Sequence, residues 1–568
     1  MVRSPPSPHA GDDGRTEATR PPPGDPLLSH PCAIVSPVTV YERRRLVVFS
    51  IFLVLVLVAG LAVNWVTGDD GDTDGAQSAS ASREAGDDAD GSSSTSGDDG
   101  DEGDGSGEDG EESTTTTEAE LPPFDGWVNP ALVGRPWSDE VEGLLTFRGS
   151  PTRTYYGEGP VPERPQVLWQ FPEAAMCAES SVGGEAKVWC GSGWTGQPSV
   201  FERDGRTWVA FGAYDRNVHL VDGVSGERIL PDFPTGDIIK GSVTIDPDGF
   251  PLLYTGSRDD EFHIVALDRE EPTELWSLHA DALAGHVWNN DWDGSAMVID
   301  DYLFEGGENS YFHIVKLNRG YDAEGKVTVS PEVVFFTPGF DDQLFADIGD
   351  DEVSIENSVA ISGNTVYFAN SGGLVQGWDI SGLKDGQDPT RVFRFWTGDD
   401  TDASIVIDEE GMLYVGSEYE RGTARSEEVG QMMKLDPSKP DDPLVWSVPD
   451  HERLDGGVWA TPALHEDIVI FANDDGEVMG IDRETGQVRW TKQLPGPTWQ
   501  SPVVVDDVLI QGDCQGTLHG FDVSDTTVEP PELWSVTLGG CIESTPAVWK
   551  GRIYVGTRAG LFYAIGDQ

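Results

Sequence analysis

Residues 457–490 read GVWATPALHEDIVIFANDDGEVMGIDRETGQVRW and contain the pattern that decides the fold. Polar turns separate three short apolar runs, and an Asp-Arg-Glu-Thr-Gly corner at residues 482–486 leads into a fourth run that ends at Trp490. Short apolar runs bounded by turn residues at this spacing are typical of antiparallel all-β folds. The stretch therefore predicts one four-stranded antiparallel unit.

The same unit recurs along the chain, and most copies end in an acidic corner followed by an aromatic residue. Seven units are complete, while residues 544–565 supply three strands of an eighth unit and residues 166–171, QVLWQF, can supply its missing strand. Pairing the two would close a ring and remove exposed sheet edges. We therefore expect an all-β, eight-bladed β-propeller of four-stranded blades. Seven blades, or a β-solenoid that is not a propeller, are the alternatives.

Tryptophans at the ends of the repeats are predicted to be structural. A large flat ring at the end of an outer strand can wedge between neighbouring sheets, and the aspartate at the corner can accept backbone N–H groups in an Asx-type turn. The blade tryptophans are Trp169, Trp276, Trp446, Trp490 and Trp534.

The region before the repeats divides into four segments by composition. Residues 1–42 are rich in Pro, Gly, Ser and charge, which predicts a disordered cytoplasmic tail. Residues 43–66 begin with three arginines and continue as an apolar run of roughly 20 residues, enough at ~1.5 Å per residue to cross a ~30 Å bilayer core. Residues 67–120 form an acidic low-complexity linker, expected to be an extended spacer rather than a calcium-binding segment. Residues 121–165 form an entry segment, and residues 166–568 form the propeller.

Charge flanking the apolar run predicts its orientation. Arginines precede the run and aspartates follow it, which places the N-terminus in the cytoplasm. A cleaved signal peptide is the alternative, but the run is longer than a usual apolar signal region and no small-x-small cleavage site follows it.

The net charge of −65, from 36 basic and 101 acidic side chains, excludes whole classes of partner. Nucleic acids and anionic lipid surfaces both need clustered Lys and Arg. Metal cations and cationic ligands remain compatible. No P-loop or dinucleotide-binding glycine pattern is present.

The repeat corners resemble the tryptophan-docking repeat of the quinoprotein alcohol dehydrogenase-like propellers, the PQQ-like repeat family, most clearly in residues 457–490 and 541–565. The resemblance implies eight blades. The family includes enzymes that use pyrroloquinoline quinone (PQQ) with calcium, and non-enzymatic relatives such as the propeller lipoprotein of bacterial outer-membrane protein assembly. Those enzymes carry a vicinal Cys-Cys disulfide, whereas no two cysteines are adjacent here and no C-x-x-C-H haem motif occurs. PQQ is therefore not expected.

One residue of each unit is predicted to face the mouth of the central channel. A hydroxyl residue starts each innermost strand, and the residue two positions earlier lies on the same side. In a closed ring these earlier residues would form a ligand pocket: Gln197, Lys240, Asp293, Glu356, Asp402, Trp459, Trp499 and Glu543. Oxygen donors suit calcium or magnesium, and Asp291 with Asp293 are the candidate metal ligands. The alternative is that the hydroxyls satisfy backbone groups and the acids are solvated.

Four cysteines follow the apolar run, and an even number on the oxidising side of a membrane predicts disulfides. Cys177 is expected to pair with Cys190. Cys514 is expected to pair with Cys541, because their loops share a face of the ring.

We expect a monomeric, single-pass protein of the cell membrane whose extracytoplasmic propeller binds or scaffolds a protein, an envelope polymer or a small ligand. No cofactor is required in this interpretation, and calcium is compatible with it. The alternative is a PQQ- and calcium-dependent dehydrogenase. A sensor that couples the propeller to the cytoplasmic tail is a third interpretation.

Overall fold

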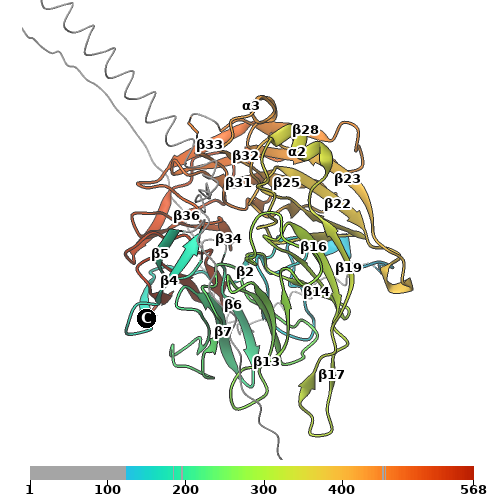
Figure 1. Ribbon diagram of the computed structural model, residues 1–568. Helices are drawn as coiled ribbons and strands as arrows, with labels where there is room; N and C mark the ends of the chain where they lie inside the picture. Colours follow the sequence, from blue (N-terminus) through green and yellow to red (C-terminus); the bar gives the residue numbers. More distant parts are fainter. Residues whose placement is uncertain (1–122, 183–184, 194–195, 451–452, 455) are drawn as a thin grey trace, which may run out of the picture. The chain divides into compact units, whose positions relative to one another are not determined.

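The computed structural model describes residues 123–182, 185–193, 196–450, 453–454 and 456–568, which lie in the compact unit of residues 114–568 (Figure 1). The predicted tail, membrane helix and linker, residues 1–42, 43–66 and 67–120, lie outside the described residues. Within the described ranges, no helix combines the length and the apolar character needed to cross a membrane.

Eight sheets of four or five mainly antiparallel strands form the propeller in the described chain, and we number them as blades one to eight. Blade one contains β1 (Gly143–Leu144), β6 (Ser199–Arg203), β7 (Arg206–Ala213), β8 (Asn217–Asp222) and β9 (Phe233–Pro234), and blade two contains β10 (Thr244–Ile245), β11 (Leu252–Gly256), β12 (Glu261–Ala266) and β13 (Thr273–His279). Blade three contains β14 (Met297–Ile299), β15 (Tyr302–Gly306), β16 (Tyr311–Lys316) and β19 (Glu332–Pro338). Blade four contains β20 (Ala360–Ser362), β21 (Thr365–Phe368), β22 (Leu374–Asp379) and β23 (Thr390–Trp396).

Blades five to eight follow the same order from the innermost strand outward. Blade five contains β24 (Val406–Ile407), β25 (Leu413–Gly416), β27 (Met432–Leu435) and β28 (Leu444–Val448), and blade six contains β30 (Ala463–His465), β31 (Ile468–Ala472), β32 (Glu477–Asp482) and β33 (Val488–Gln493). Blade seven contains β34 (Val503–Val505), β35 (Val508–Gly512), β36 (Thr517–Asp522) and β37 (Glu532–Thr537). Blade eight contains β2 (Gly157–Glu158), β38 (Ala547–Trp549), β39 (Arg552–Gly556), β40 (Phe562–Gly566) and β3 (Gln166–Phe171).

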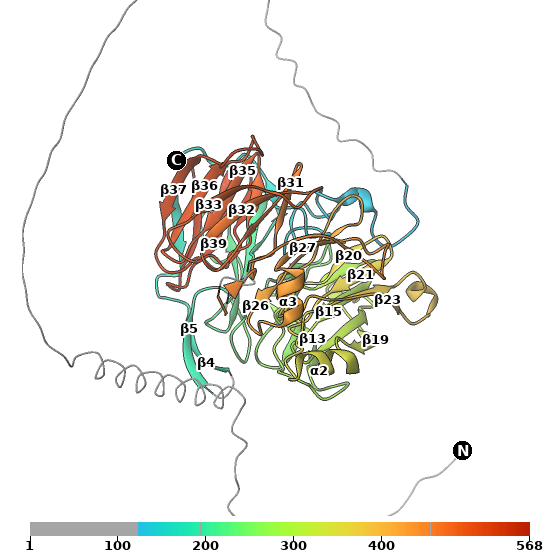
Figure 2. The same ribbon diagram turned by 90° about the horizontal axis from the view of Figure 1, so that it is seen from above.

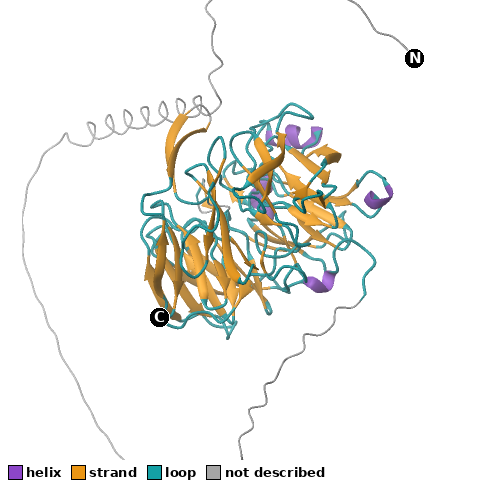
Figure 3. Cartoon of the chain, turned by 90° about the horizontal axis from the view of Figure 1, so that it is seen from below, coloured by secondary structure: helices purple, strands orange, loops and turns teal. Residues whose placement is uncertain are grey.

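The remaining elements lie outside the eight blades, and the helices among them are short (Figure 3). Three two-stranded pairs are β4 (Cys177–Val182) with β5 (Glu185–Cys190), β17 (Gly320–Tyr321) with β18 (Val327–Thr328), and β26 (Glu418–Tyr419) with β29 (Gly456–Gly457). The helical turns and helices are η1 (Pro130–Leu132), α2 (Asp342–Ile348), η2 (Leu383–Asp385) and α3 (Ala424–Val429).

Blade eight is completed by a strand from the front of the folded region, as predicted. β3 pairs antiparallel with β40, with Gln166 opposite Gly566 and Phe171 opposite Phe562. The predicted eight-bladed propeller is therefore confirmed, and the alternative of seven blades is wrong. Six blades have four strands, while blades one and eight each carry a fifth, because β1 and β2 add to their inner edges.

Apolar side chains on both faces of the strands form the core between blades. All five residues of β31 are buried, because each face of the sheet packs against a neighbouring blade. One apolar cluster spans blades six, seven and eight and includes Ile470, Leu509 and Ile553. Burial on both faces explains why the inner strands read as short continuous apolar runs rather than as alternating patterns.

Two blade tryptophans dock on the corner of the next blade. Trp169 Nε1 donates to the carbonyl oxygen of Gly223 at 3.1 Å, and Trp446 Nε1 donates to that of Arg483 at 3.0 Å. Gly486 has a φ of +72°, and a Cβ there would lie 2.7 Å from the Trp446 ring. The corner therefore needs glycine both for its left-handed backbone and for the close approach of the ring.

The other blade tryptophans pack differently. Trp490 and Trp534 lie over Gly480 and Gly520, the cross-strand residues of their own sheets. Trp276 is partly buried against the apolar cluster of blades two and three.

The two predicted disulfides are confirmed. Cys177 and Cys190 face each other across β4 and β5, a hairpin that projects from the rest of the unit (Figure 2). Cys514 and Cys541 join loops of blades seven and eight.

Residues 142–158, which we call the hub segment, lie inside the ring and reach every blade. β1 pairs with β6 of blade one, and β2 runs parallel to β38 of blade eight. The carbonyl oxygens of Leu145, Pro151 and Thr152 accept hydrogen bonds from Ile245, Ile361 and Ile407 of blades two, four and five. Thr146 Oγ1 donates to the carbonyl oxygen of Ala296, just before the inner strand of blade three. Arg148 donates to the carbonyl oxygens of Pro462 and Pro502, just before the inner strands of blades six and seven.

Candidate functional site

Hydroxyl side chains at the starts of the inner strands link successive blades around the channel. Ser242 Oγ accepts the backbone N–H of Gln197 at 2.8 Å, and Ser358 Oγ accepts that of Ser295 at 2.9 Å. The hydroxyl of Ser404 likewise accepts the backbone N–H of Ser358 in the preceding blade. The hydroxyl of Thr461 accepts that of Ser404, and the hydroxyl of Ser501 accepts that of Thr461. These hydroxyls satisfy backbone groups and hold the inner strands at fixed positions, which places the residues two positions earlier at the channel mouth.

One side of the mouth is a compact arrangement of basic and acidic groups, the lysine cluster of Lys240, Arg258, Asp291, Asp293 and Glu308. Lys240 Nζ lies 2.8 Å from Glu308 Oε1 and 3.3 Å from Asp291 Oδ2, and it also contacts Asp293. Arg258 Nε donates to Asp291 Oδ2 at 2.6 Å. The predicted metal ligands Asp291 and Asp293 are therefore brought together, but lysine and arginine already supply positive charge beside them.

The electrostatics of the lysine cluster follow from burial and pairing. Burial alone would lower the pKa of Lys240, but the surrounding carboxylates of Asp293, Glu308 and Asp291 raise it well above its usual value. Burial raises the pKa of Asp293 well above its usual range, and the Asp291 carboxylate adds to this. Lys240 overcomes the effect of burial on Glu308 and holds the pKa of that carboxyl low. The lysine cluster is thus an internally compensated ion network.

The other side of the mouth is formed by four carboxyl groups, the acidic cluster of Glu356, Asp400, Asp402 and Glu418. One carboxylate oxygen each from Asp400, Asp402 and Glu418 lies within 4.8 Å of the other two. Asp402 and Glu356 line the same small pocket, and burial raises the pKa of both well above the usual value. Asp402 adds to the rise for Glu356, and Asp400 adds to the rise for Asp402. Burial, followed by Asp402 and Asp400, raises the pKa of Glu418 well above its usual value.

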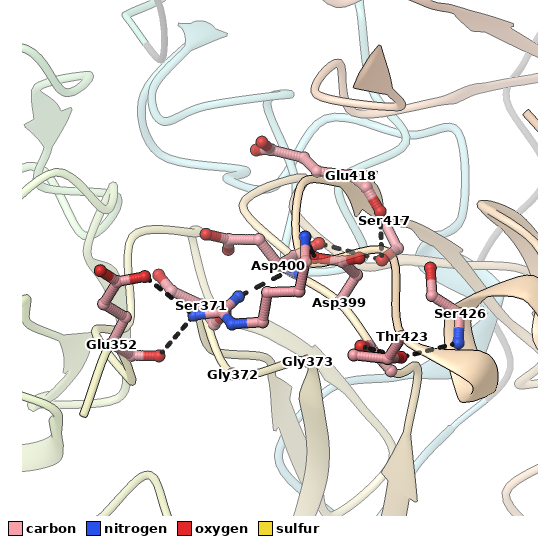
Figure 4. Close-up of polar contacts among 12 residues, drawn as sticks. Glu352, Ser371, Gly372, Gly373, Asp399, Asp400, Ser417, Glu418, Thr423 and Ser426 are labelled. Atoms are coloured by element: carbon pink, nitrogen blue, oxygen red, sulfur yellow. Dashed lines mark hydrogen bonds and ion pairs between the residues drawn. The ribbon is translucent and has the colours of Figure 1, made fainter. Parts of the chain in front are cut away.

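Two loops of blade five position the acidic cluster (Figure 4). Asp400 lies in the loop before β24, and Glu418 begins β26. The carbonyl oxygen of Asp400 accepts the backbone N–H of Glu418 at 2.8 Å and the hydroxyl of Ser417 at 3.0 Å. This pair of hydrogen bonds fixes the two loops against each other and brings their carboxylates together.

Two tryptophans form the third part of the mouth. The rings of Trp459 and Trp499 stack with centroids 5.5 Å apart and an interplanar angle of 18°. Both line the pocket that also contains Glu356 and Asp402, and Phe147 of the hub segment contributes to the lining. The pocket thus combines an aromatic wall, carboxylates and a lining residue supplied by the chain's own N-terminal side.

The free space in this pocket is about 10 Å³, enough for about one water molecule. The pocket also has no vicinal cysteine pair, because all four cysteines near the propeller are joined as Cys177–Cys190 and Cys514–Cys541.

The two remaining predicted positions face the same channel but belong to separate contacts. Gln197 accepts the backbone N–H of Arg148 and donates to the carbonyl oxygen of Pro546 at 2.8 Å. Glu543 pairs with Arg558 at 2.8 Å. Of the eight predicted pocket residues, four line one pocket, Lys240 and Asp293 pair in the lysine cluster, and Gln197 and Glu543 hold neighbouring structure.

The sequence patterns missed Asp400, Glu418 and Glu308. Asp400 could have been found, because it lies two positions before Asp402 and period-two alternation places both on one side. Glu308 and Glu418 follow the second strands of their blades, where only the folded chain shows which side chains approach the mouth. The hub segment carries one sequence signal, since residues 143–157 contain two arginines and no acidic residue in a strongly acidic protein.

Comparison with known proteins supports the repeat assignment. Residues 430–529 match a family model described as outer membrane protein assembly factor BamB. The resemblance to the PQQ-like propellers is confirmed. A search of curated proteins finds no significant match.

Solved structures with a similar chain path share little sequence with this protein. BamB from Moraxella catarrhalis is 16% identical with a TM-score of 0.45, and the match covers 71% of this chain and 98% of that one. Quinohemoprotein alcohol dehydrogenase from Comamonas testosteroni is 13% identical with a TM-score of 0.47, covering 75% and 80%. Sqt1 from Saccharomyces cerevisiae is 11% identical with a TM-score of 0.46, covering 63% and 92%. The blade count therefore depends on this chain's own strand pairing.

Proposed function

We propose that the chain is a membrane-anchored binding module, whose propeller is held outside the cytoplasmic membrane by the helix of residues 43–66 and the linker of residues 67–120. Its partner is a protein or an envelope polymer that contacts the rim of the channel mouth. The observation that carries this proposal is the hub segment, which fills the channel and leaves the pocket with space for about one water molecule. A filled channel favours recognition at the rim over turnover of a substrate held inside.

Further support comes from the family match and from the chemistry of the rim. The matched family is described as an outer membrane protein assembly factor, which supports a protein-binding role. Exposed apolar side chains flank the two clusters: Trp288, 42% exposed, precedes Asn289, which bonds Glu308, and Leu454, 56% exposed, lies beside Gly422. Apolar groups beside charged ones are the usual composition of a recognition surface.

Site-specific photocrosslinking tests the binding role. A photoreactive residue is placed at Trp288 or Leu454 of the full-length chain, with Leu533 of the outer strand β37 as a control of similar exposure, 50%. We expect a discrete crosslinked species in intact cells from the two rim positions only. Equal crosslinking from Leu533, or none from the rim, would contradict the proposal.

Thiol labelling tests the anchored topology. Cys32 precedes the apolar run, and Ser92→Cys places a thiol in the linker. A membrane-impermeant maleimide applied to intact cells is expected to label Ser92→Cys but not Cys32, while lysed cells allow both. Labelling of Cys32 in intact cells would reject this orientation.

A turnover assay separates the proposal from the dehydrogenase alternative. Purified full-length protein is incubated with PQQ, Ca²⁺ and an artificial electron acceptor in the presence of alcohols or sugars. We expect no reduction of the acceptor above that seen with PQQ and Ca²⁺ alone. Protein-dependent reduction would establish the dehydrogenase instead.

A further inference from the structure

The carboxylate of Glu418 is the most unusual group at the channel mouth. The residue is only 2% exposed, and no hydrogen bond or ion pair to its carboxylate is found among the residues that the structure describes. Its oxygen nevertheless lies within 4.8 Å of carboxylate oxygens of both Asp400 and Asp402. A buried carboxylate aimed at two others, without a donor, carries a large desolvation cost unless a cation or a proton compensates it.

The nearby basic residues form their ion pairs with other groups. Arg421 Nη1 donates to the carbonyl oxygen of Ser371 at 2.7 Å, and its other nitrogens reach Asp350 and Glu352. The charge of Arg421 also acts on Asp400, but burial still keeps the pKa of Asp400 well above its usual value. Lys240 is held by the three acids of the lysine cluster. The two sides of the mouth therefore differ, because Lys240 and Arg258 form ion pairs within the lysine cluster, whereas no ion pair to Asp400, Asp402 or Glu418 is found among the described residues.

The geometry of the three carboxylates matches a shared ion. Two oxygens bound to one Ca²⁺ at roughly 2.4 Å each can lie up to about 4.8 Å apart, which is the span within which the three oxygens lie. Among the described residues, no hydrogen-bond partner is found for the buried atoms Asp402 Oδ1 and Asp400 Oδ1, so their lone pairs can coordinate an ion. Glu356, on the same pocket wall as Asp402, supplies a fourth carboxylate next to the cluster.

We infer that Asp400, Asp402 and Glu418 bind a divalent cation of the size of Ca²⁺ on the acidic side of the channel mouth. The ion compensates the buried carboxylates and locks the loop before β24 onto β26. This site differs from the Asp291–Asp293 pair, where Lys240 and Arg258 supply the positive charge. It is independent of the proposed partner, since it concerns the state of the mouth before any partner binds.

Terbium luminescence is the direct test. Tb³⁺ replaces Ca²⁺ at carboxylate sites and emits after energy transfer from a nearby excited tryptophan, and Trp459 and Trp499 line the same pocket as Asp402. Full-length protein is expected to give Tb³⁺ emission on tryptophan excitation, which Ca²⁺ displaces. Glu418→Gln, which keeps the shape of the side chain, is expected to weaken Tb³⁺ binding at least tenfold. Glu484→Gln, in the exposed corner of blade six, is the matched control and should leave it unchanged.

Thermal unfolding supplies a second readout. At a Ca²⁺ concentration about 100-fold above Kd, the melting temperature should rise by roughly 3 °C for a domain of this size. Glu418→Gln should lose this rise and should melt no lower than the wild type in EDTA, because it removes an uncompensated buried charge. All variants retain the acidic linker, so weak binding there cancels in the comparison. Equal Tb³⁺ affinity in Glu418→Gln and wild type, or an unchanged Ca²⁺ response, would overturn the inference.

Discussion

Arg153 shows how the hub segment is fixed at the level of single side chains. Its Nε and Nη2 donate to the carbonyl oxygen of Val359, Nη2 also donates to that of Ser295 at 2.9 Å, and Nη1 donates to that of Phe147 at 2.8 Å. Burial lowers the pKa of Arg153 to about 9, while Glu305 opposes the shift. The planar fork of arginine reaches several carbonyl oxygens in fixed directions, which lysine cannot do.

Replacing Arg153 should therefore destabilise the propeller strongly. Arg153→Met retains much of the side-chain volume but leaves the carbonyl oxygens of Val359 and Ser295 without these donors, at about 1–3 kcal/mol for each unsatisfied buried group. We expect a loss of about 3 kcal/mol or more in the free energy of unfolding, measured by urea denaturation. Arg164→Met, at an exposed position, is the control. Similar denaturation midpoints for the two variants would contradict this account of the hub segment.

His313 on β16 gives a pH-dependent prediction. The side chain is 3% exposed beside the Trp292 ring, and burial lowers its pKa to about 4 from an ordinary 6.5. Between these pH values the unfolded chain takes up a proton that the folded chain does not, so stability falls as pH decreases through this window. The contribution amounts to about 3 kcal/mol between pH 7 and pH 4.

His313→Gln should remove this part of the acid sensitivity. The measurement is the free energy of unfolding of both proteins at pH 7 and pH 4.5. The wild type should lose more stability than the variant, by about 2–3 kcal/mol. The same loss in both proteins would show that His313 is protonated in the folded state without penalty.

At the scale of the element, the tryptophan corner sets the contact between successive blades. Trp446 lies in the middle of β28, the outer strand of blade five, and donates to the carbonyl oxygen of Arg483 in blade six. Asp482 Oδ1 accepts the backbone N–H groups of Glu484 and Thr485, which shapes the corner that receives the ring. Burial of a large ring and one hydrogen bond are thus both placed between two sheets.

Trp446→Phe and Trp446→Ala separate these two contributions. Phe should cost about 1–2 kcal/mol through the lost hydrogen bond and part of the ring area, and Ala about 3–5 kcal/mol through the cavity left between blades. Trp288→Ala, at a 42% exposed position, should cost much less. Chemical denaturation measures all three. Equal losses for Trp446→Ala and Trp288→Ala would remove Trp446 from the interblade contact.

The elements differ in how far sequence could predict them. Each blade closes on itself locally, so the period of the repeat and the corner residues were sufficient for eight blades and for β3 as the missing strand. Period-two alternation was sufficient to bring Glu356, Asp402, Trp459 and Trp499 together. Glu418 was not predictable, since it lies in the excursion between β25 and β27 whose direction is set by the loop before β24. The hub segment has no repeat, and its partners lie up to about 400 residues away, as for Gly157 and Val548.

At the scale of the whole molecule, the ring is closed by two different devices. β3 supplies the outer strand of blade eight from the N-terminal side, and the hub segment joins the inner strands of all eight blades. Both are formed by residues that precede blade one in the chain. The segment before blade one therefore determines whether seven locally formed sheets become one closed ring.

Two chains with different starting points test this dependence. A chain that begins at residue 123 retains the hub segment and β3, and we expect it to unfold in one cooperative transition. A chain that begins at residue 172 loses both, so the inner ends of β6 to β38 lose their common partner and β40 becomes an exposed edge strand, which favours association. We expect this shorter chain to aggregate or to exchange its amide hydrogens rapidly in blade eight, and a peptide of residues 123–171 added during refolding to restore a soluble monomer. Size-exclusion chromatography and hydrogen exchange measure both effects. A soluble shorter chain with protected β40 amides would show that the blades close without the N-terminal segment.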